Sequence, residues 1–324
     1  SMFLRQFNYL IAVAEEKHFG RAADRCCVTQ PSLSSGIKQL ELELGITIFL
    51  RGRGQRVLGL TPAGERAAAW ARRVIAYCDA MRDDLDGMRN ELKGSIRIGA
   101  MPSMSPVLPT LISRFNKRHP GVRADVQFVG IDDLKQRLSR FSLDVGMTYV
   151  DQEDLGHLNT LPIFWETLQL LVPDDETFAG RDSITWQEVA DLPLAMLRPS
   201  MRERQFVDGV FAKSGVTPEP RVESESILHL MFQVQFAGLV TIVPGHFATM
   251  PGLPAGTRML NLVEPSVSQQ VAIVWAQGDP PIPMSGAFVN LMTKLLRDGE
   301  LARILGDLTI VERPPKRACQ LDAL

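Results

Sequence analysis

Residues 19–64 read FGRAADRCCVTQPSLSSGIKQLELELGITIFLRGRGQRVLGLTPAG, and this stretch decides the fold of the N-terminal part of the chain. Four of its apolar residues recur at the spacing of one helix face: Leu33, Ile37, Leu40 and Leu44. Thr29 is a good N-cap residue, Pro31 is tolerated in a first helical turn, and Gly45 favours the end of a helix. The pattern predicts a helix over 30–44 with a single buried stripe.

Two further helices are predicted before this one. Residues 4–16 place apolar side chains at helical spacing. Residues 19–26 form a shorter helix, with Ala22, Ala23 and Cys26 on one face. Small residues on that face allow another helix to approach closely, so the three segments are expected to pack together.

The opposite face of the third helix is small, polar and basic. Its members are Gln30, Pro31, Ser34, Ser35 and Lys38. Such a face fits a DNA major groove, where hydroxyl and ammonium groups reach base edges and phosphates. An ordinary amphipathic helix with a solvated face has the same pattern, and the helix alone leaves both readings open.

Residues 51–56 read RGRGQR and lie between apolar flanks, which predicts a hairpin tip. Arg51, Arg53 and Arg56 crowd three cations into one turn, as suits contact with phosphates or insertion into a minor groove. A solvated charge run is the alternative for this segment.

A long helix is predicted from Pro62 to about Lys93, because Thr61-Pro62 is a helix start and no helix breaker follows until Gly87. Its apolar residues alternate in steps of four and three, the repeat of a coiled-coil seam. They are Ala67, Ala71, Val74, Cys78, Met81, Leu85, Met88 and Leu92. We expect dimerisation through Val74, Cys78, Met81, Leu85 and Met88; packing within its own domain is the alternative.

Strand and helix patterns alternate after Gly94, which predicts an α/β fold with βαβ units. The predicted strands cover 95–99, 126–129, 144–148, 168–172, 239–243 and 271–275. The predicted helices cover 106–118, 132–141, 201–214, 227–236 and 285–296. Two series of elements, joined by crossovers near 161–167 and Ser268, indicate two lobes around a cleft.

Composition limits the class of protein. The chain has 324 residues, 45% hydrophobic and 22% charged, as expected for a globular protein of about two domains. Residues 1–93 hold 14 basic and 11 acidic residues, and the remainder holds 21 and 26. We expect no membrane span, no secretory signal and a reducing cytoplasm. Walker, HExxH and GxSxG motifs are absent from the sequence, so neither an enzyme nor a cofactor is expected.

Residues 19–64 resemble the winged helix-turn-helix of LysR-type transcriptional regulators. The matching positions are Ala22, Ala23, Gln30, Pro31, Leu33, Ser34, Ile37, Leu40, Glu41, Leu44, Gly45, Phe49, Arg51 and the run Leu60-Thr61-x-Ala63-Gly64. Ser35 and Gly36 stand where the family often has Arg or Gln, so less direct base readout is expected there. The alternation after Gly94 is similar to the family's effector domain, which has the two-lobed fold of periplasmic solute-binding proteins.

The resemblance implies a domain plan. A winged helix-turn-helix covers 2–61, a linker helix 62–93, a two-lobed effector domain 94–305, and a tail 306–324. Lobe I takes about 94–164 and 271–305, and lobe II about 165–270. The implied partners are double-stranded operator DNA, a small-molecule effector and a second copy of the chain in a homodimer or homotetramer, with RNA polymerase as a further partner to consider. A solute-binding protein of a transport system and an architectural DNA-binding protein are the rival classes.

In such a fold, ligands bind at the carboxyl ends of strands and at helix N-termini. The residues expected there are Ser103, Ile131, Thr148, Ser200 and Arg202. The N-terminal part is particularly similar to peroxide-sensing members of the family, whose effector domains need a reactive thiol. Ser200 stands where that thiol is expected, and the helix after it has no cysteine. We therefore expect a reversible ligand, a carboxylate or another anion, with a redox-responsive regulator as the alternative.

Overall fold

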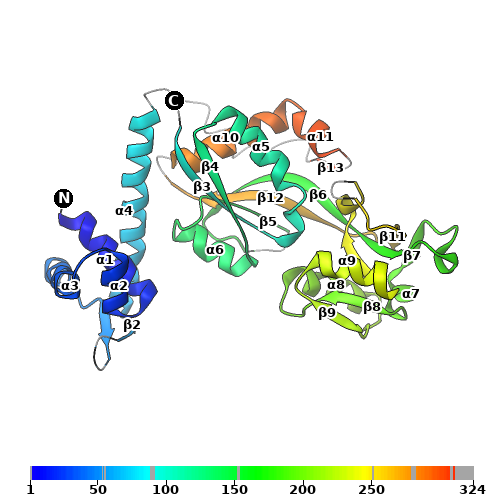
Figure 1. Ribbon diagram of the computed structural model, residues 1–324, viewed down its shortest axis with the longest axis horizontal. Coiled ribbons are helices and arrows are strands. Elements are labelled where there is room, and N and C mark those ends of the chain that lie inside the picture. Colours follow the sequence, from blue (N-terminus) through cyan, green and yellow to red (C-terminus); the bar gives the residue numbers. More distant parts are fainter. Residues whose placement is uncertain are drawn as a thin grey trace. The chain divides into compact units, whose positions relative to one another are not determined.

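The computed structural model describes residues 2–52, 54, 56–87, 92–151, 154–249, 252–278, 282–306 and 309–310. These residues form two compact units (Figure 1). The first unit consists of three helices, a β-hairpin and a long helix; its three helices and hairpin are called the head here. The second unit, the effector domain, contains the elements from β3 onward. The fold expected from the sequence, a winged helix-turn-helix with a long helix and a two-lobed α/β domain, is confirmed.

Three helices build the core of the head. They are α1 (Met2–Glu16), α2 (Phe19–Arg25) and α3 (Gln30–Leu44). Leu33, Ile37 and Leu40 are fully buried, as their spacing predicts, and Ala22 and Ala23 bring α2 close to its neighbours. Leu44 departs from the predicted stripe. It is 41% exposed because it is the last residue of α3.

The ends of α3 are set by backbone geometry. Gly45 closes the helix with φ of 66°, in the left-handed region that glycine adopts without strain. Thr29 occupies the N-cap position, but its side chain makes no capping hydrogen bond, in contrast to the expected role. Gly36 lies against α1, where a Cβ atom would come within 2.8 Å of the Tyr9 ring. A glycine is therefore required on that part of α3.

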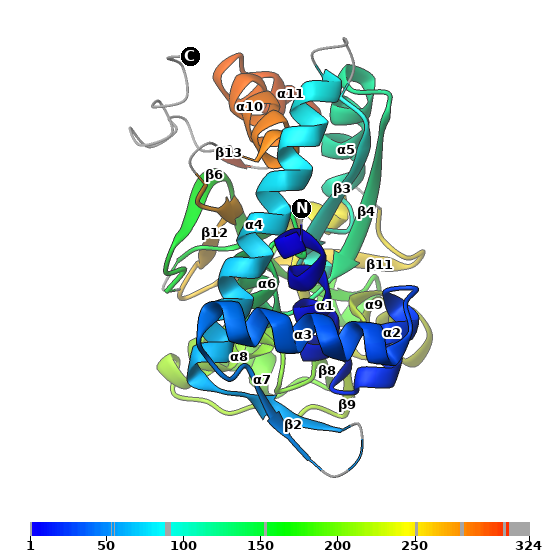
Figure 2. The same cartoon turned by 90° about the vertical axis from the view of Figure 1, so that its left-hand side faces the viewer.

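The wing is the hairpin of β1 (Phe49–Arg51) and β2 (Val57–Leu60), which projects from the head beside α3 (Figure 2). Phe49 pairs with Leu60, and the register shifts between Leu50 and Arg51. The Phe49 ring is buried against Phe19 of α2, with ring centroids 5.9 Å apart. This contact fixes the base of the wing on the head.

The long helix α4 (Pro62–Gly87) starts as the sequence predicts, because the Thr61 hydroxyl accepts a hydrogen bond of 2.9 Å from the Gly64 amide. Ala68 and Ala71 are fully buried in the core of the head, and Ala67 packs against it. The first two residues of the predicted seam, Ala67 and Ala71, therefore pack within the head and are not available for dimerisation. From Val74 onward the apolar side chains of α4 leave that core.

The effector domain begins with a sheet in the order β4-β3-β5-β12-β6. Its strands are β3 (Gly94–Ala100), β4 (Val122–Phe128), β5 (Val145–Tyr149), β6 (Leu158–Pro173) and β12 (Ser268–Ala276). Figure 1 shows α5 (Leu108–Arg118) and α10 (Pro283–Arg297) on one side of this sheet and α6 (Ile131–Ser139) on the other. The 3₁₀ turn η1 (Pro102–Met104), α11 (Glu300–Leu305) and β13 (Thr309–Ile310) complete this lobe.

The second lobe is built on β6, β10, β8 and β9 in that order, with β11 and β7 added beside β6. Its strands are β7 (Ser183–Thr185), β8 (Leu194–Leu197), β9 (Val222–Ser224), β10 (Val240–Pro244) and β11 (Thr257–Val263). Its helices and turns are η2 (Glu176–Phe178), α7 (Trp186–Ala190), α8 (Arg202–Lys213), α9 (Ile227–Ala237) and η3 (Gly245–Ala248). Its core is centred on Trp186 and Phe211, whose rings meet edge to face.

The chain passes between the lobes twice: within the strand β6, and again between β11 and β12, just before Ser268 as the sequence suggests. β6 pairs with β12 up to Thr167 and with β10 from Leu168 onward. The sequence suggests a connection over 161–167, and this segment is the middle part of the continuous strand β6. Pro162 obscures the strand pattern, and the register with β12 shifts at Pro162–Phe164, where a proline is tolerated in a strand.

Candidate functional site

The exposed face of α3 holds the residues expected to read DNA. Pro31, Ser35 and Lys38 are exposed, and Gln30 and Ser34 are half-buried. All five belong to one 15-residue helix whose opposite stripe is buried in the head. The small side chains of Ser34 and Ser35 leave the middle of this face open to close approach, with the Lys38 ammonium one turn further along.

The wing arginines differ in their surroundings. The guanidinium of Arg51 lies 3.3 Å from the Glu41 carboxylate and stacks 5.4 Å from the Phe19 ring centroid. Glu41 also accepts a hydrogen bond of 2.8 Å from the Ile48 amide. Arg51 therefore ties the wing to α3. Arg56 is exposed, with its backbone bridged to His18. Arg53 lies outside the described residues.

The residues expected at the dimer seam lie on α4. Val74, Met81 and Leu85 are exposed apolar side chains, and Cys78 is half-buried. Met88 lies outside the described residues. Leu85 is 54% exposed and Met81 57%, so these two present the largest apolar surface of the seam to solvent.

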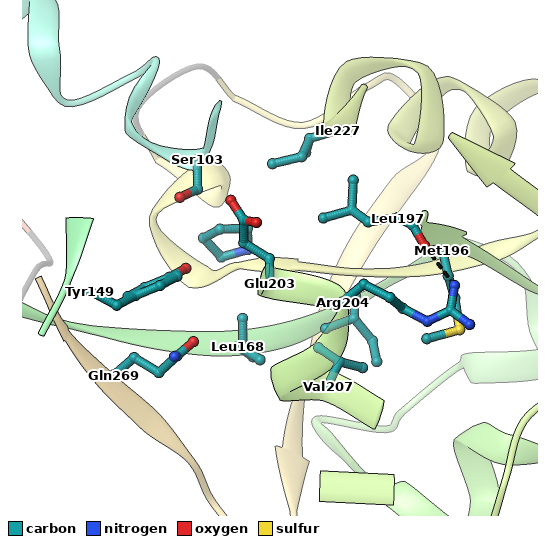
Figure 3. Close-up of a pocket in the computed structure, with 12 residues that line it drawn as sticks. Ser103, Tyr149, Leu168, Met196, Leu197, Glu203, Arg204, Val207, Ile227 and Gln269 are labelled. Carbon is teal, nitrogen blue, oxygen red and sulfur yellow. Dashed lines mark hydrogen bonds between the residues drawn. The ribbon is translucent and has the colours of Figure 1, made fainter. Parts of the chain in front are cut away.

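A cavity lies between the two lobes of the effector domain (Figure 3). Leu168, Met196, Val207, Ile227 and Ile242 form its apolar side. These side chains come from β6, β8, α8, α9 and β10, so the cavity is built largely by the second lobe. It is called the smaller cavity here.

The other side of the smaller cavity is polar. Ser103 follows β3 in the turn η1, Tyr149 ends β5, Glu203 lies in the first turn of α8, and Gln269 lies on β12. Figure 3 shows the Ser103 hydroxyl, the Tyr149 phenol and the Glu203 carboxylate directed toward the same space. Among the described residues, neither Ser103 Oγ nor Glu203 Oε1 has a hydrogen-bond partner, although both atoms are buried. Unpaired buried acceptors of this kind are costly unless a ligand satisfies them.

A larger and more open cavity adjoins the first, since Glu203 lines both. Of the residues expected to bind the effector, Ile131, Thr148, Ser200 and Arg202 line the larger cavity, and Ser103 lines the smaller. Thr148 is fully buried, and its hydroxyl lacks a hydrogen-bond partner among the described residues. The structure thus brings the five residues around two adjoining cavities.

The charges around these cavities do not match the expected anion. The larger cavity is lined by one cation, Arg202, and by four acidic residues: Asp132, Asp133, Glu203 and Glu225. The two aspartates occupy the first turn of α6, where an anionic ligand would otherwise meet the helix N-terminus. In the smaller cavity, the only cation among the lining residues is Arg204. The lining charges therefore do not favour the anionic effector expected from the sequence.

Arg204 is held by other partners. Its guanidinium lies 2.8 Å from Asp208, 2.9 Å from Glu223 and 2.6 Å from the Leu197 carbonyl oxygen. Figure 3 shows it turned toward Leu197 and away from the polar side of the cavity. Two carboxylates already neutralise this cation, so it has little to offer an anion.

A buried polar network lies behind the smaller cavity. The Tyr149 phenol donates a hydrogen bond to Glu166, and His246 Nε2 lies 3.0 Å from the Ser103 carbonyl oxygen. Burial raises the pKa of Glu166 to about 8 and lowers the pKa of His246 to about 4. At neutral pH both groups are therefore mainly uncharged. Burial also raises the pKa of Glu203.

The sequence indicates Tyr149, at the end of a predicted strand, and the stretch 200–204 that contains Glu203 as parts of the cleft, but it gives no role to Glu166 or His246. Glu166 had one available signal, since it is an acidic residue within an otherwise apolar strand run, FWETLQLL. Within the stretch 200–204, the sequence does not distinguish Glu203 from the neighbouring arginines as the residue that faces the smaller cavity. Consecutive residues of α8 point in different directions around the helix axis, so Glu203 faces the smaller cavity and the Arg204 guanidinium points away from it.

A head with a recognition helix and wing, followed by a long helix and a two-lobed domain around a cavity, is the architecture of a DNA-binding regulator that carries its own ligand-binding domain. Two family models match the chain. The bacterial regulatory helix-turn-helix of the lysR family matches residues 4–65, and the LysR substrate binding domain matches residues 89–297. The chain belongs to the LysR family of DNA-binding transcription regulators. A solute-binding protein of a transport system is thereby ruled out as its class.

Individual relatives are similar over most of the chain. The hydrogen peroxide-inducible genes activator of Dickeya chrysanthemi is 26% identical over 86% of this chain and 91% of its own length. A probable activator of the same kind from Streptomyces viridosporus is 29% identical over 85% of this chain and 88% of its own.

Among solved structures, a cysteine-to-aspartate variant of full-length OxyR from Pseudomonas aeruginosa matches with a TM-score of 0.72 and 26% identity, covering 96% of this chain and 98% of that one. Full-length CbnR in complex with its target DNA matches with a TM-score of 0.60 and 20% identity, covering 90% of this chain and 99% of that one. The second likeness concerns the fold alone. No helix in the described part of the chain is long and apolar enough to cross a membrane.

Proposed function

We propose that this protein is a dimeric regulator that binds promoter DNA through α3 and the wing, and that a small molecule bound between the lobes of its effector domain switches its activity. The observation that carries the proposal is the pair of adjoining cavities, with unpartnered buried polar atoms on Ser103, Thr148 and Glu203. A ligand that closes the lobes around these atoms binds the closed form more tightly, and so shifts the population toward it.

DNA contact is assigned to the open face of α3 and to Arg56. Lys38→Ala and Arg56→Ala should each weaken binding to the intergenic region beside the protein's own gene and reduce the salt dependence of log K by about 0.9. Ser35→Ala should change base preference more than affinity. Lys117→Ala in the effector domain removes the same charge and serves as the control. DNA binding is measured by fluorescence anisotropy. An affinity equal to that of the parent in both Lys38→Ala and Arg56→Ala would contradict the assignment.

Ligand control is tested with the cavity residues. A protein-free small-molecule extract of the host cells should raise the melting temperature of the full chain and change its promoter activity in a reporter assay. Ser103→Ala and Thr148→Val should reduce both effects. Ser105→Ala is a matched control, because Ser105 is exposed and only two residues away from Ser103. Unchanged responses in both cavity variants would overturn ligand control from this site.

A redox-responsive regulator is the second candidate, favoured by the names of the peroxide-inducible relatives. Against it, the sequence has no cysteine between Cys78 and Cys319, and Ser200 occupies the stretch where the thiol is expected. Replacing Cys26, Cys27, Cys78 and Cys319 by Ser or Ala should leave the regulatory response intact. Loss of the response in a folded variant would restore the thiol mechanism.

A further inference from the structure

We propose that the effector is a small organic cation, an ammonium group on an apolar body, whose charge is received by the Glu203 carboxylate. This inference rests on the proposed function and specifies the ligand that the cleft takes. The apolar body lies along Leu168, Met196, Val207 and Ile242, and the ammonium group meets the polar side of the smaller cavity.

The first argument is the number and direction of acceptors. Glu203 Oε1 and Ser103 Oγ are buried without a hydrogen-bond partner among the described residues, and Figure 3 shows both groups facing the cavity. Ser103 is fully buried, so its hydroxyl is not directed toward bulk solvent. An ammonium group has three donors and no acceptor, which suits a carboxylate and a hydroxyl placed on one side of a cavity.

The second argument is the lack of a free positive charge for an anion. Arg204 is neutralised by Asp208 and Glu223. In the larger cavity, Asp132, Asp133 and Glu225 lie within 4 Å of Lys135, Arg137 and Arg198, so Glu203 is the acidic residue that bears most directly on a ligand of both cavities. A ligand carboxylate placed beside Glu203 would meet a like charge in a region of low polarity. A ligand ammonium in the same place would remove the cost of an unpaired buried carboxylate.

The third argument is the shape of the site. Five aliphatic or thioether side chains line the smaller cavity together with its polar groups: Leu168, Met196, Val207, Ile227 and Ile242. A cavity with this division binds an amphipathic molecule better than a hydrated inorganic ion. The expected body is therefore a phenyl ring or a short alkyl chain.

Binding of such a cation is linked to protons. Burial raises the pKa of Glu203 in the free protein, and an ammonium partner favours the ionised form, so binding releases a proton from the fraction that is protonated. The affinity for the cation should therefore rise as the pH increases through the pKa that Glu203 has in the free protein. A carboxylate ligand would give the opposite sign. The other ionisable groups around Glu203 are Tyr149, Glu166, His246, Arg202, Arg204, Glu225, Asp132 and Asp133.

The experiment uses triplets of probes that share a body and differ in charge: 2-phenylethylamine, 2-phenylethanol and 3-phenylpropionate, and the corresponding hexyl compounds. Calorimetric titration of the full chain at several pH values should show at least tenfold tighter binding of the amine than of the carboxylate in one triplet, with proton release. Glu203→Gln should reduce amine affinity at least tenfold and leave the alcohol unchanged. Glu225→Gln, which removes an exposed carboxylate of the larger cavity, is the matched control.

Tighter binding of the carboxylate, proton uptake, or the absence of amine binding in both triplets would overturn the cationic effector. Equal loss of alcohol and amine binding in Glu203→Gln would point to damage to the cavity. In that case, Ser103→Ala supplies the second measurement, and an unchanged amine affinity there also rejects the proposal. These failures leave ligand control standing, since the extract experiment above tests that function without assuming any ligand class.

Discussion

The Tyr149 phenol donates a hydrogen bond to the Glu166 carboxyl group, and both side chains are almost wholly buried between the sheets of the effector domain. With a pKa of about 8, Glu166 keeps a proton in the folded state that the unfolded chain loses near its ordinary value of 4.5. The stability that this proton contributes is complete below the unfolded pKa and is lost as the pH rises through the folded pKa.

The expected outcome is a free energy of unfolding that falls with rising pH across that window, by at most about 1.4 kcal/mol per pH unit. Glu166→Gln keeps the site neutral and should flatten this part of the curve. Urea unfolding at a series of pH values measures it, with Glu219→Gln as the control for an exposed carboxylate. A slope that is the same in Glu166→Gln and the parent would show that Glu166 does not titrate in this range.

Glu41 is expected to be more important for the head than its surface position suggests. Glu41→Ala leaves the Ile48 and Phe49 amides without their side-chain acceptor and leaves Arg51 without its carboxylate. We expect a loss of about 1–3 kcal/mol in stability of the head, together with weaker DNA binding through a displaced wing. Glu43→Ala is the matched control, because the Glu43 carboxylate accepts a hydrogen bond of 3.0 Å from Gln39 on the exposed side of the same helix. Equal stability of the two variants in thermal unfolding would contradict this role.

Gly64 is required by packing at the start of α4. A Cβ atom there would lie 2.2 Å from the Ile48 carbonyl oxygen, and this backbone atom cannot move aside as a flexible side chain would. Gly64→Ala should therefore destabilise the head by more than the ~1–3 kcal/mol typical of overpacking by added methyl groups. Gly59→Ala has nothing within 4 Å of its Cβ and should be nearly neutral. Similar melting temperatures for the two variants would show that α4 can shift to accommodate the methyl group.

Leu85 tests the dimer seam. A glutamate at this position would place a desolvated charge in the interface, at a cost of several kcal/mol. Leu85→Glu should lower both the dimer fraction and the affinity for operator DNA. Ala69→Glu adds the same charge at an exposed position of α4 outside the repeat. Sedimentation velocity distinguishes the cases, and an unchanged dimer fraction in Leu85→Glu would remove α4 from the interface.

Local signals account for what could be predicted from the sequence. The bounds of α3 are matched because its period, the proline in its first turn and the glycine at its end all act within a few residues. The same holds for the start of α4. Strand β8 was missed because a buried run of four residues has no pattern that distinguishes it from a piece of helix, and β11 was missed although Leu260, Asn261 and Leu262 alternate between buried and exposed.

The candidate site was only partly predictable, because its properties depend on contacts distant in sequence. Ser103 and Thr148 could be expected at strand ends, where ligands bind in α/β folds. The engagement of Arg51 by Glu41, and of Arg204 by Glu223 and Asp208, depends on tertiary packing. Those contacts decide which charges remain available to a ligand, and the sequence alone does not show them.

The continuous strand β6 makes the gene sensitive to one kind of mutation. Successive side chains of a strand point to opposite faces, so removal of one codon between Ile163 and Gln169 would turn every later residue of β6 to the wrong face. One half of the strand lies in each sheet, and such an in-frame deletion would misalign both lobes at once. Removal of a codon from the loop between β6 and η2 changes the face of no residue in β6. A deletion scan should therefore show a sharp boundary of tolerance at Pro173.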